Sequence, residues 1–373
     1  MSTTKIPQKV KYELLLRSAG RCEFQGCNKP LFLHHVTYDF CKIAEYAHII
    51  ADSPSGPRGC VDSKELAKDI SNIMLLCPDC HKYIDIEGKD KYDANALKAM
   101  KERHESRILK LTSMKEDDEA HIVTYGAKIA DVNPEFSFSL LQQALLPNFY
   151  PAKETTIDLG GNWFVGKDWN EFWKHEVEQL EYSFKEYILS CLPKWENKRI
   201  ALFAFAPMPL LIKLGTLLNN KYEVEVFQKQ RIGGWTWPST KEHIDFQIKN
   251  PVKYSGSPVL VVSLSFPICE RIKRNRPDAS IWEVTIEKTN PDFLQSRAML
   301  YDFGRCMEKV FDDISRASAT TSIDLYISAP VACVVELGRV WMKKANAPLN
   351  VYDYDKRYSK EDKLAITIKN ENV

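Results

Sequence analysis

The sequence predicts two domains of different fold class, a small α+β domain followed by a larger α/β domain. Four of the ten cysteines form two close pairs within the first 80 residues. Residues 92–111 then combine strong helix formers with apolar residues near helical spacing, which predicts a helix that closes the first domain. Beyond a polar, acidic stretch, strand-like and helix-like segments alternate, which is typical of an α/β domain.

The cysteine pairs predict a zinc site in the first domain. Cys22 with Cys27 and Cys77 with Cys80 supply the four thiolates that a tetrahedral Zn²⁺ ion takes. The interval between the pairs is longer than a simple zinc knuckle needs, so the residues within it can form a hairpin held against a helix that begins near Pro78. The other six cysteines are scattered, as reduced thiols usually are.

The residues around these pairs resemble the HNH, or ββα-metal, endonucleases that carry a Cys-x-x-Cys motif. In that family a hairpin histidine is followed by an asparagine and then by a leucine-rich strand leading into Cys-x-x-Cys-His. This chain has His48, Asn72 and Cys77-Pro-Asp-Cys80-His81 in that order, and the resemblance covers roughly residues 1–110. It implies that His48 is the general base, that Asn72 holds the base-bearing loop, and that His81 is a ligand of a catalytic divalent ion.

The chemistry of the side chains supports these roles. A histidine with a pKa of about 6.5 is largely neutral at cellular pH, so His48 can take a proton from the water that attacks a phosphodiester. Asp85 lies four residues after His81, on the same helix face, and can share a divalent ion with it. Some relatives carry another ligand just before the base, but Ala47 cannot serve. The ion then takes water, substrate oxygens or Glu45, which Mg²⁺ tolerates because it usually keeps several waters.

Three simpler interpretations stay open. The cysteines also fit a purely structural zinc site with His48 and His81 incidental, or His81 could replace a cysteine as a zinc ligand. Asp85 could be an ordinary carboxylate on a helix surface. His34 and His35 lie in an apolar run and suit a hairpin better than a metal site.

Composition constrains where the protein works and what it binds. The chain has no run of 18 apolar residues and no apolar signal core at its start, so we expect a cytoplasmic protein without a membrane partner. Residues 1–110 hold 18 Lys and Arg against 15 Asp and Glu, so one copy should bind duplex DNA weakly. Assembly of several copies would add their contacts, which favours a nuclease that depends on homo-oligomerisation.

The expected domain limits are residues 1–111 for the first domain, 112–124 for a linker and 125–373 for the second domain. The linker could equally be one end of a helix. Within the second domain we expect a helix at residues 169–190 and strands at residues 198–206, 222–227, 258–266, 281–287 and 322–328.

An internal repeat organises the second domain. Residues 205–215 align with residues 328–338, and each segment reads as a strand, an Ala-Pro turn and a helix followed by another strand. The pseudo-repeats run over about residues 198–228 and 322–354, which predicts two related half-domains. Each turn delivers a helix N-terminus, and two such ends would suit a small ligand with two or more phosphates.

This duplicated pattern after an HNH-like domain resembles the SAVED domain, a fusion of two CARF-like Rossmannoid halves. SAVED domains fused to HNH nucleases are effectors of the CBASS antiphage system. The resemblance implies recognition of a cyclic di- or trinucleotide made by a partner nucleotidyltransferase, followed by self-assembly and cleavage of double-stranded DNA. We therefore expect a cyclic-oligonucleotide-activated, metal-dependent endonuclease with structural Zn²⁺ and catalytic Mg²⁺ or another divalent ion.

Ligand contacts are predicted from chemistry alone. Residues 231–238 offer the Arg231 guanidinium for a phosphate and the Trp235 and Trp237 indoles for base stacking, although both indoles also suit a core or a subunit interface. The basic run at residues 271–276 is either a solvated loop or a contact for phosphate or DNA.

The two Ala-Pro turns are the next candidates for ligand contact. Pro207 and Met208 follow the first strand of one repeat, and Pro330 and Val331 follow the first strand of the other. Their alternative is an ordinary strand-to-helix connection.

Two other functions compete with this interpretation. One is a modification-dependent HNH restriction endonuclease whose second domain reads a DNA base, which would call for a more basic face. The other is a non-catalytic, zinc-containing nucleotide sensor that only scaffolds partners.

Overall fold

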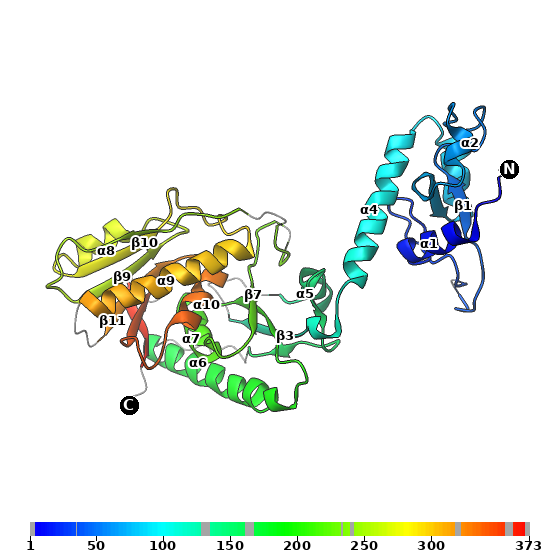
Figure 1. The fold of residues 1–373 in the computed structure, drawn as a ribbon. Coiled ribbons are helices and arrows are strands. Elements are labelled where there is room, and N and C mark those ends of the chain that lie inside the picture. The colour runs from blue at the N-terminus through cyan, green and yellow to red at the C-terminus, as the bar shows by residue number, and fades with distance from the viewer. Residues whose placement is uncertain are drawn as a thin grey trace. The chain divides into compact units, whose positions relative to one another are not determined.

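The structure, a computed structural model, describes residues 4–34, 36–127, 135–160, 168–232, 234–238, 242–317, 322–354 and 361–369. It divides the chain into two compact units, Met1–Lys115 and Glu116–Val373 (Figure 1). Within the described ranges, none of the helices combines the length and the apolar character needed to cross a membrane.

The first unit is built on a two-stranded hairpin. Strands β1 and β2 pair antiparallel, with His48 opposite Ile73, and β2 leads through Cys77 directly into α3. The Cys77 thiol accepts a hydrogen bond from the Cys80 N–H, and Pro78 at the first helical position also favours a helix start there. The elements in chain order are α1 (Gln8–Ser18), β1 (Glu45–His48), α2 (Ser63–Leu66), η1 (Ile70–Asn72), β2 (Ile73–Leu76), α3 (Pro78–Lys82), η2 (Tyr83–Glu87) and α4 (Ala94–Thr112).

Strand β2 is the centre of the first unit's core. All four of its residues, Ile73 to Leu76, are fully buried, and they pack in one cluster with Leu14 of α1 and Leu97 of α4. Because both faces of β2 are buried, the register is set by its pairing with β1, which places Glu45 opposite Leu76 and His48 opposite Ile73. The register in turn fixes where β1 places Glu45 and His48.

The second unit contains two largely parallel sheets. One has the strand order β4-β3-β6-β7, with β5 also pairing with β3, and the other has the order β13-β12-β11-β9-β10-β8. The expected strands at β6, β7, β9, β10 and β11 are confirmed, and so is the α/β class. The strands are β3 (Glu119–Gly126), β4 (Tyr150–Pro151), β5 (Ile157–Asp158), β6 (Ile200–Phe205), β7 (Val224–Phe227), β8 (Gln247–Lys249), β9 (Pro258–Ser263), β10 (Ser280–Thr285), β11 (Ile323–Ser328), β12 (Leu349–Asp353) and β13 (Lys363–Ile368).

One apolar core joins the two sheets of the second unit. Leu202 of β6 and Leu325 of β11 belong to the same buried cluster, together with the apolar faces of α7 and α10. The remaining helices are η3 (Glu116–Asp118), α5 (Phe138–Leu145), α6 (Trp169–Ser183) with its continuation η4 (Phe184–Leu189), η5 (Leu192–Lys194), α7 (Met208–Leu218), α8 (Cys269–Asn275), α9 (Arg297–Ala317) and α10 (Val331–Val340).

The expected linker at residues 112–124 is wrong over its second half. Residues 119–126 form β3, which pairs with β6 from His121 to Gly126 and is buried along most of its length. Two of its polar residues find partners on other segments: the His121 Nε2 atom lies 3.0 Å from the Asn197 carbonyl oxygen, and the Thr124 hydroxyl donates to Asp158. The acidic residues before β3 resemble a linker, but the segment that follows them is a central strand that carries His121 and Thr124 into the sheet.

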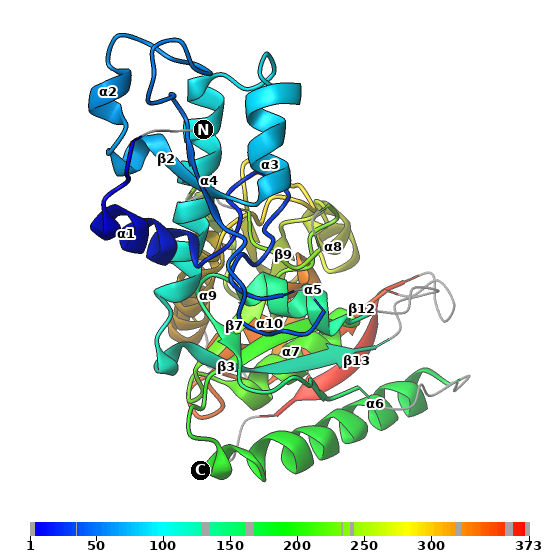
Figure 2. The ribbon, with the colours of Figure 1, turned by 90° about the vertical axis from the view of Figure 1, so that its right-hand side faces the viewer.

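Helices α7 and α10, one from each repeat, cross at a pair of glycines and lie side by side in both views of the molecule (Figures 1 and 2). A Cβ atom on Gly215 would collide with the Val335 carbonyl and lie 2.8 Å from the Gly338 Cα atom. A Cβ atom on Gly338 would collide with the Ile212 carbonyl. The Leu-Gly pair shared by the repeats therefore marks the point where two backbones meet, which only glycine permits.

Substitution of this glycine pair tests the crossing. We expect Gly215→Ala to lower the free energy of unfolding by about 1–3 kcal/mol, because the added methyl group meets main chain that cannot rotate away. Gly304→Ala in α9 is the matched control, since the atoms nearest to its Cβ atom would belong to the flexible Glu336 side chain. Urea unfolding of the three proteins measures the difference, and equal stability of the two variants would contradict the crossing.

Candidate functional site

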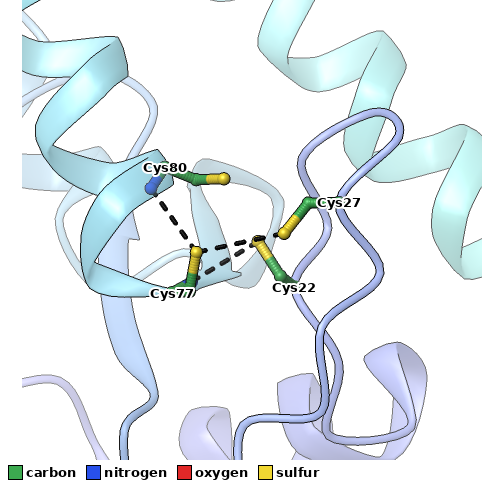
Figure 3. Close-up of side chains that lie close together, drawn as sticks. All are labelled: Cys22, Cys27, Cys77 and Cys80. Atoms are coloured by element: carbon green, nitrogen blue, oxygen red, sulfur yellow. Dashed lines mark hydrogen bonds between the residues drawn. The ribbon is translucent and has the colours of Figure 1, made fainter.

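The four paired cysteines converge on one point in the first unit (Figure 3). Their Sγ atoms all lie within 4.8 Å of one another, and the Cys27 and Cys77 sulfurs are 4.0 Å apart. Four sulfurs at about 2.3 Å from a tetrahedral zinc ion would be roughly 3.8 Å apart. The cluster is therefore compatible with a four-thiolate metal site, as the sequence predicts.

The surroundings of the thiols make a negative charge on them costly. Burial raises the pKa of the Cys22 thiol to about 12, so a thiolate there needs a compensating positive charge. The Cys77 N–H donates to the Cys22 sulfur at 3.4 Å, which is the kind of contact that orients a ligand. Since four cysteines converge without His81, nothing in this cluster calls for His81 as a replacement ligand.

His48 ends β1 and is 8% exposed. Its Nε2 atom lies 2.9 Å from the Ala67 carbonyl oxygen. A carbonyl only accepts hydrogen bonds, so Nε2 carries the proton and Nδ1 keeps a lone pair in the neutral ring. The contact therefore selects the tautomer that leaves Nδ1 able to accept a proton.

Asn72 ties together the chain segments around His48. It is 1% exposed; its Oδ1 atom accepts from the Ile50 N–H at 2.8 Å, and its Nδ2 group donates to the carbonyls of Ile50 at 2.9 Å and Leu66 at 3.2 Å. Ile50 follows β1 and Leu66 precedes Ala67, the hydrogen-bond partner of His48. The Asn72 side chain thus holds both the end of β1, which carries His48, and the loop at Leu66 and Ala67, which orients the His48 ring.

His81 lies between two carboxylates. Its Nδ1 atom is 2.7 Å from Glu45 Oε2, and its Nε2 atom is 3.3 Å from Asp85 Oδ2. The hydrogen bond with Asp85 is the largest influence on His81 and, together with Glu45, raises its pKa despite burial. Burial favours the neutral form of Asp85, but hydrogen bonds from His81 and Arg58 hold its pKa below the usual range. The structure thus brings Glu45 beside His81, while Ala47 is fully buried.

Arg58 is a site residue that the sequence reasoning missed. Its guanidinium donates to the carbonyls of Ile49 at 2.6 Å and Ile84 at 2.9 Å, and to Asp85 Oδ1 at 2.6 Å. It therefore links the end of β1 to the helical segment that carries Asp85. Arg58 lies in a loop rich in Ser, Gly and Pro without motif spacing, so no local signal distinguishes it.

These groups open onto one cleft of about 690 Å³, lined by Glu45, Tyr46, His48, His81 and Asp85 among others. Two carboxylates and an imidazole are the oxygen and nitrogen donors that suit a divalent ion such as Mg²⁺ or Mn²⁺. The carboxylates here bind opposite nitrogens of the His81 ring, so their oxygens do not converge as the four sulfurs do.

The repeat turns of the second unit precede helices, as predicted. Pro207 is the N-cap residue of α7 and Pro330 that of α10, with the half-buried Met208 and Val331 as the first helical residues.

The α10 N-terminus is already capped from the other repeat. Gln228, at the end of β7, accepts from the Ala332 N–H through its Oε1 atom at 3.1 Å and is 8% exposed. Sequence reasoning missed Gln228, because its partner is more than 100 residues away.

Trp235 does not serve as the predicted stacking platform. It is 3% exposed and belongs to the core, where its ring stacks on Phe136 at 5.8 Å and meets Phe203 edge-on at 5.3 Å. Trp237 is half-buried and packs against the same cluster. Of the predicted loop contacts, Arg231 is the exposed one, and its side chain pairs with Asp292 at 3.0 Å.

The basic run at residues 271–276 is matched by acids. Arg271 pairs with Asp362, Lys273 with Glu270 and Arg276 with Asp324. These ion pairs leave the run less available to phosphate than its sequence implies.

Comparison with known proteins bears on the second unit. Residues 185–364 match the family model of SAVED, described as the SMODS-associated and fused to various effectors sensor domain. The match supports the prediction of a SAVED sensor domain in the second unit. A search of curated proteins finds no match.

Solved structures of Cap4 SAVED/CARF-domain containing receptors are also similar to the chain. The Acinetobacter baumannii receptor with the cyclic trinucleotide 2′3′3′-cAAA is 11% identical, with a TM-score of 0.42 over 83% of this chain and 66% of that chain. The same receptor with 3′3′3′-cAAA is 10% identical, with a TM-score of 0.41 over 78% and 66%. The Moraxella osloensis receptor is 12% identical, with a TM-score of 0.39 over 78% and 64%. The chain thus spans less than two thirds of the length of each of these structures.

Metal analysis tests the cysteine cluster. We expect one zinc ion per chain, lost in Cys77→Ser together with the thermal stability of the first unit, because the four ligands connect segments that are distant in the chain. Cys60→Ser is the control, since Cys60 is exposed and lies outside the cluster. Full zinc content in Cys77→Ser, measured by mass spectrometry of the metal, would refute the site.

Substitution of Asn72 tests how His48 is held. We expect Asn72→Ala to lower the free energy of unfolding by about 1–3 kcal/mol, because three partly buried main-chain groups lose their partner. Amide hydrogen exchange should accelerate around residues 49–50 and 66–67, whereas Asn95→Ala on the exposed face of α4 should change neither quantity. Unaltered exchange in Asn72→Ala would show that the loop is held by other contacts.

Proposed function

We propose that the chain is a DNA endonuclease of the HNH type, activated when its SAVED domain binds a cyclic oligonucleotide and the chains assemble. One observation carries the nuclease part of the proposal. His48, whose Nε2–H is committed to the Ala67 carbonyl, opens onto the same cleft as the Glu45–His81–Asp85 group. A proton acceptor beside a set of hard metal ligands is what metal-assisted phosphodiester hydrolysis requires.

In the proposed reaction, His48 takes a proton at Nδ1 from the water that attacks the phosphorus, and the bond to the 3′ oxygen breaks as that oxygen takes a proton from solvent water. Asn72 keeps His48 in place through Ile50 and Leu66, and Arg58 orients Asp85. His81, Asp85 and Glu45 would hold the divalent ion, which requires the carboxylates to leave the opposite nitrogens of the His81 ring and turn toward one point. When bound, such an ion stabilises the negative charge that develops on the phosphate oxygens.

The family match supports the sensing part of the proposal. Its description names a sensor domain fused to effectors, and the second unit supplies two repeats whose strands each lead into a helix N-terminus. A cyclic di- or trinucleotide is the expected ligand. The ligand activates the enzyme only if it binds the assembled state more tightly than the single chain, because equal affinity for both would not shift the equilibrium between them.

Charge distribution favours this function over a DNA-reading second unit. Residues 116–373 hold 32 Lys and Arg against 35 Asp and Glu, which is a net acidic balance. A domain that reads modified bases in duplex DNA is expected to carry a basic face. A free nucleotide needs only a few local cations.

Plasmid digestion by the full chain tests the proposal. The assay contains Mg²⁺ and a panel of cyclic di- and trinucleotides that includes 2′3′3′-cAAA and 3′3′3′-cAAA, read beside light scattering for particle mass. We expect one ligand to trigger both cleavage and an increase in mass. His48→Ala should slow cleavage by roughly 10²–10⁴-fold without changing ligand-induced thermal stabilisation, and His34→Ala, an exposed histidine outside the cleft, should cut normally.

The competing functions give different results in the same assay. Tight binding of modified duplexes, with no stabilisation by any cyclic nucleotide, would indicate a modification-dependent restriction endonuclease. Stabilisation by a cyclic nucleotide without cleavage under any metal condition would indicate a non-catalytic sensor.

A further inference from the structure

Two lysines lie over one aromatic ring at the edge of the cleft. The Nζ atom of Lys11, from α1, is 5.2 Å from the ring centroid of Tyr46, and that of Lys42, just before β1, is 5.7 Å from it. Neither lysine forms an ion pair with an acidic side chain of the described residues. Two like charges therefore share one ring without a carboxylate to neutralise them.

The ring belongs to the candidate active site. Tyr46 lines the cleft and precedes His48 by two residues in β1, so the two side chains leave the strand on the same face. Lys82, next to His81 on α3, lines the same cleft and is likewise without an acidic partner among the described residues. Ammonium groups thus stand on the β1 side and on the α3 side of the cleft that holds His48.

The interior of the cleft has the opposite character. Glu45 and Asp85 place carboxylates there, and they are occupied by His81 and Arg58. Because these cationic groups are already paired with carboxylates, a polyanion must find its cations at the margin of the cleft. The ring of Tyr46 positions both lysine side chains through cation–π contact while leaving their N–H donors free for an anion.

We propose that Lys11 and Lys42, held on Tyr46, each bind one backbone phosphate of the DNA strand that enters the cleft, and that Lys82 binds a third phosphate on the other side of the cleft. The inference rests on the proposed nuclease function and states how the substrate is held. Phosphate contacts position a strand without reading its sequence. The arrangement therefore predicts cleavage with little sequence preference.

The test measures binding of a fluorescein-labelled duplex of random sequence by full-length His48→Ala protein over a range of salt concentrations. Lys11→Ala and Lys42→Ala are then combined with His48→Ala in one protein. We expect this protein to bind the duplex about tenfold or more weakly, and its slope of log K against log salt to be smaller by about 2. Tyr46→Phe, which keeps the ring, should leave both quantities unchanged. Tyr46→Ala should weaken binding.

Three controls separate this role from a structural one. The pair Lys11→Arg and Lys42→Arg keeps the charges and should keep the salt slope. The pair Lys64→Ala and Lys110→Ala removes two exposed lysines outside the cleft and should leave the slope within error. If the double alanine variant fails to fold, by thermal unfolding and zinc content, the single variants Lys11→Gln and Lys42→Gln should each lower the slope by about 1.

The outcomes distinguish this inference from the proposed function. An unchanged salt slope in the lysine variants, or no duplex binding by the parent protein, overturns the phosphate site. Plasmid cleavage by the wild type with unaltered KM in the lysine variants also overturns it while leaving the nuclease intact. If the lysine variants lose salt slope but the wild-type protein cleaves no DNA with any metal or cyclic nucleotide, the phosphate site is supported and the nuclease is overturned.

Discussion

The convergence of four thiols organises the first unit. They join the loop at Cys22 and Cys27 to the start of α3 at Cys77 and Cys80, segments that are otherwise 50 residues apart in the chain. Cys77 follows directly on β2, and His81 directly follows Cys80. A metal at this point would therefore hold β2 and α3 together, and the hairpin register then fixes Glu45 and His48. A small domain gains much of its folding energy from such a site because its core is limited.

The second unit is held by a different constraint, the contact of two backbones at Gly215 and Gly338. Because α7 and α10 come from opposite repeats, this contact merges the repeats into one core, and Gln228 adds a hydrogen bond across them. Two halves that share a packed core resist hinge motion, since interiors are close-packed and transmit strain. In the proposed function, we therefore expect ligand binding to cause assembly of chains rather than opening of the two halves.

The sequence predicted features that depend on spacing and periodicity. Four thiolates must meet for zinc to bind, so the cysteine pairs determined the cluster, and buried apolar runs indicated β6, β9 and β11. The aligned Leu-Gly pairs identified the repeat, although only the structure explains their glycines.

The failures share a physical cause, which is that tertiary contacts override local signals. The sequence did not reveal strand β3 because His121 and Thr124 find partners on other segments, and Trp235, a candidate for base stacking, is buried in the core. Arg58 acts through hydrogen bonds to Ile84 and Asp85, and Gln228 through one with Ala332; these long-range contacts leave no pattern in the chain.

The weak electrostatic attraction of one copy for DNA would keep the proposed enzyme inactive before assembly. If Lys11, Lys42 and Lys82 each neutralise one phosphate, the affinity of one copy falls with salt at a logarithmic slope of about 2.7, or roughly 40-fold between 50 and 200 mM. A chain with a formal net charge of +1 has little other attraction for DNA, so a single copy would hold a duplex weakly in the cell. Copies joined by the ligand present several such sites to one duplex, and the second contact then benefits from a high effective concentration. In the proposed function, weak phosphate binding by each copy would make cleavage depend on assembly.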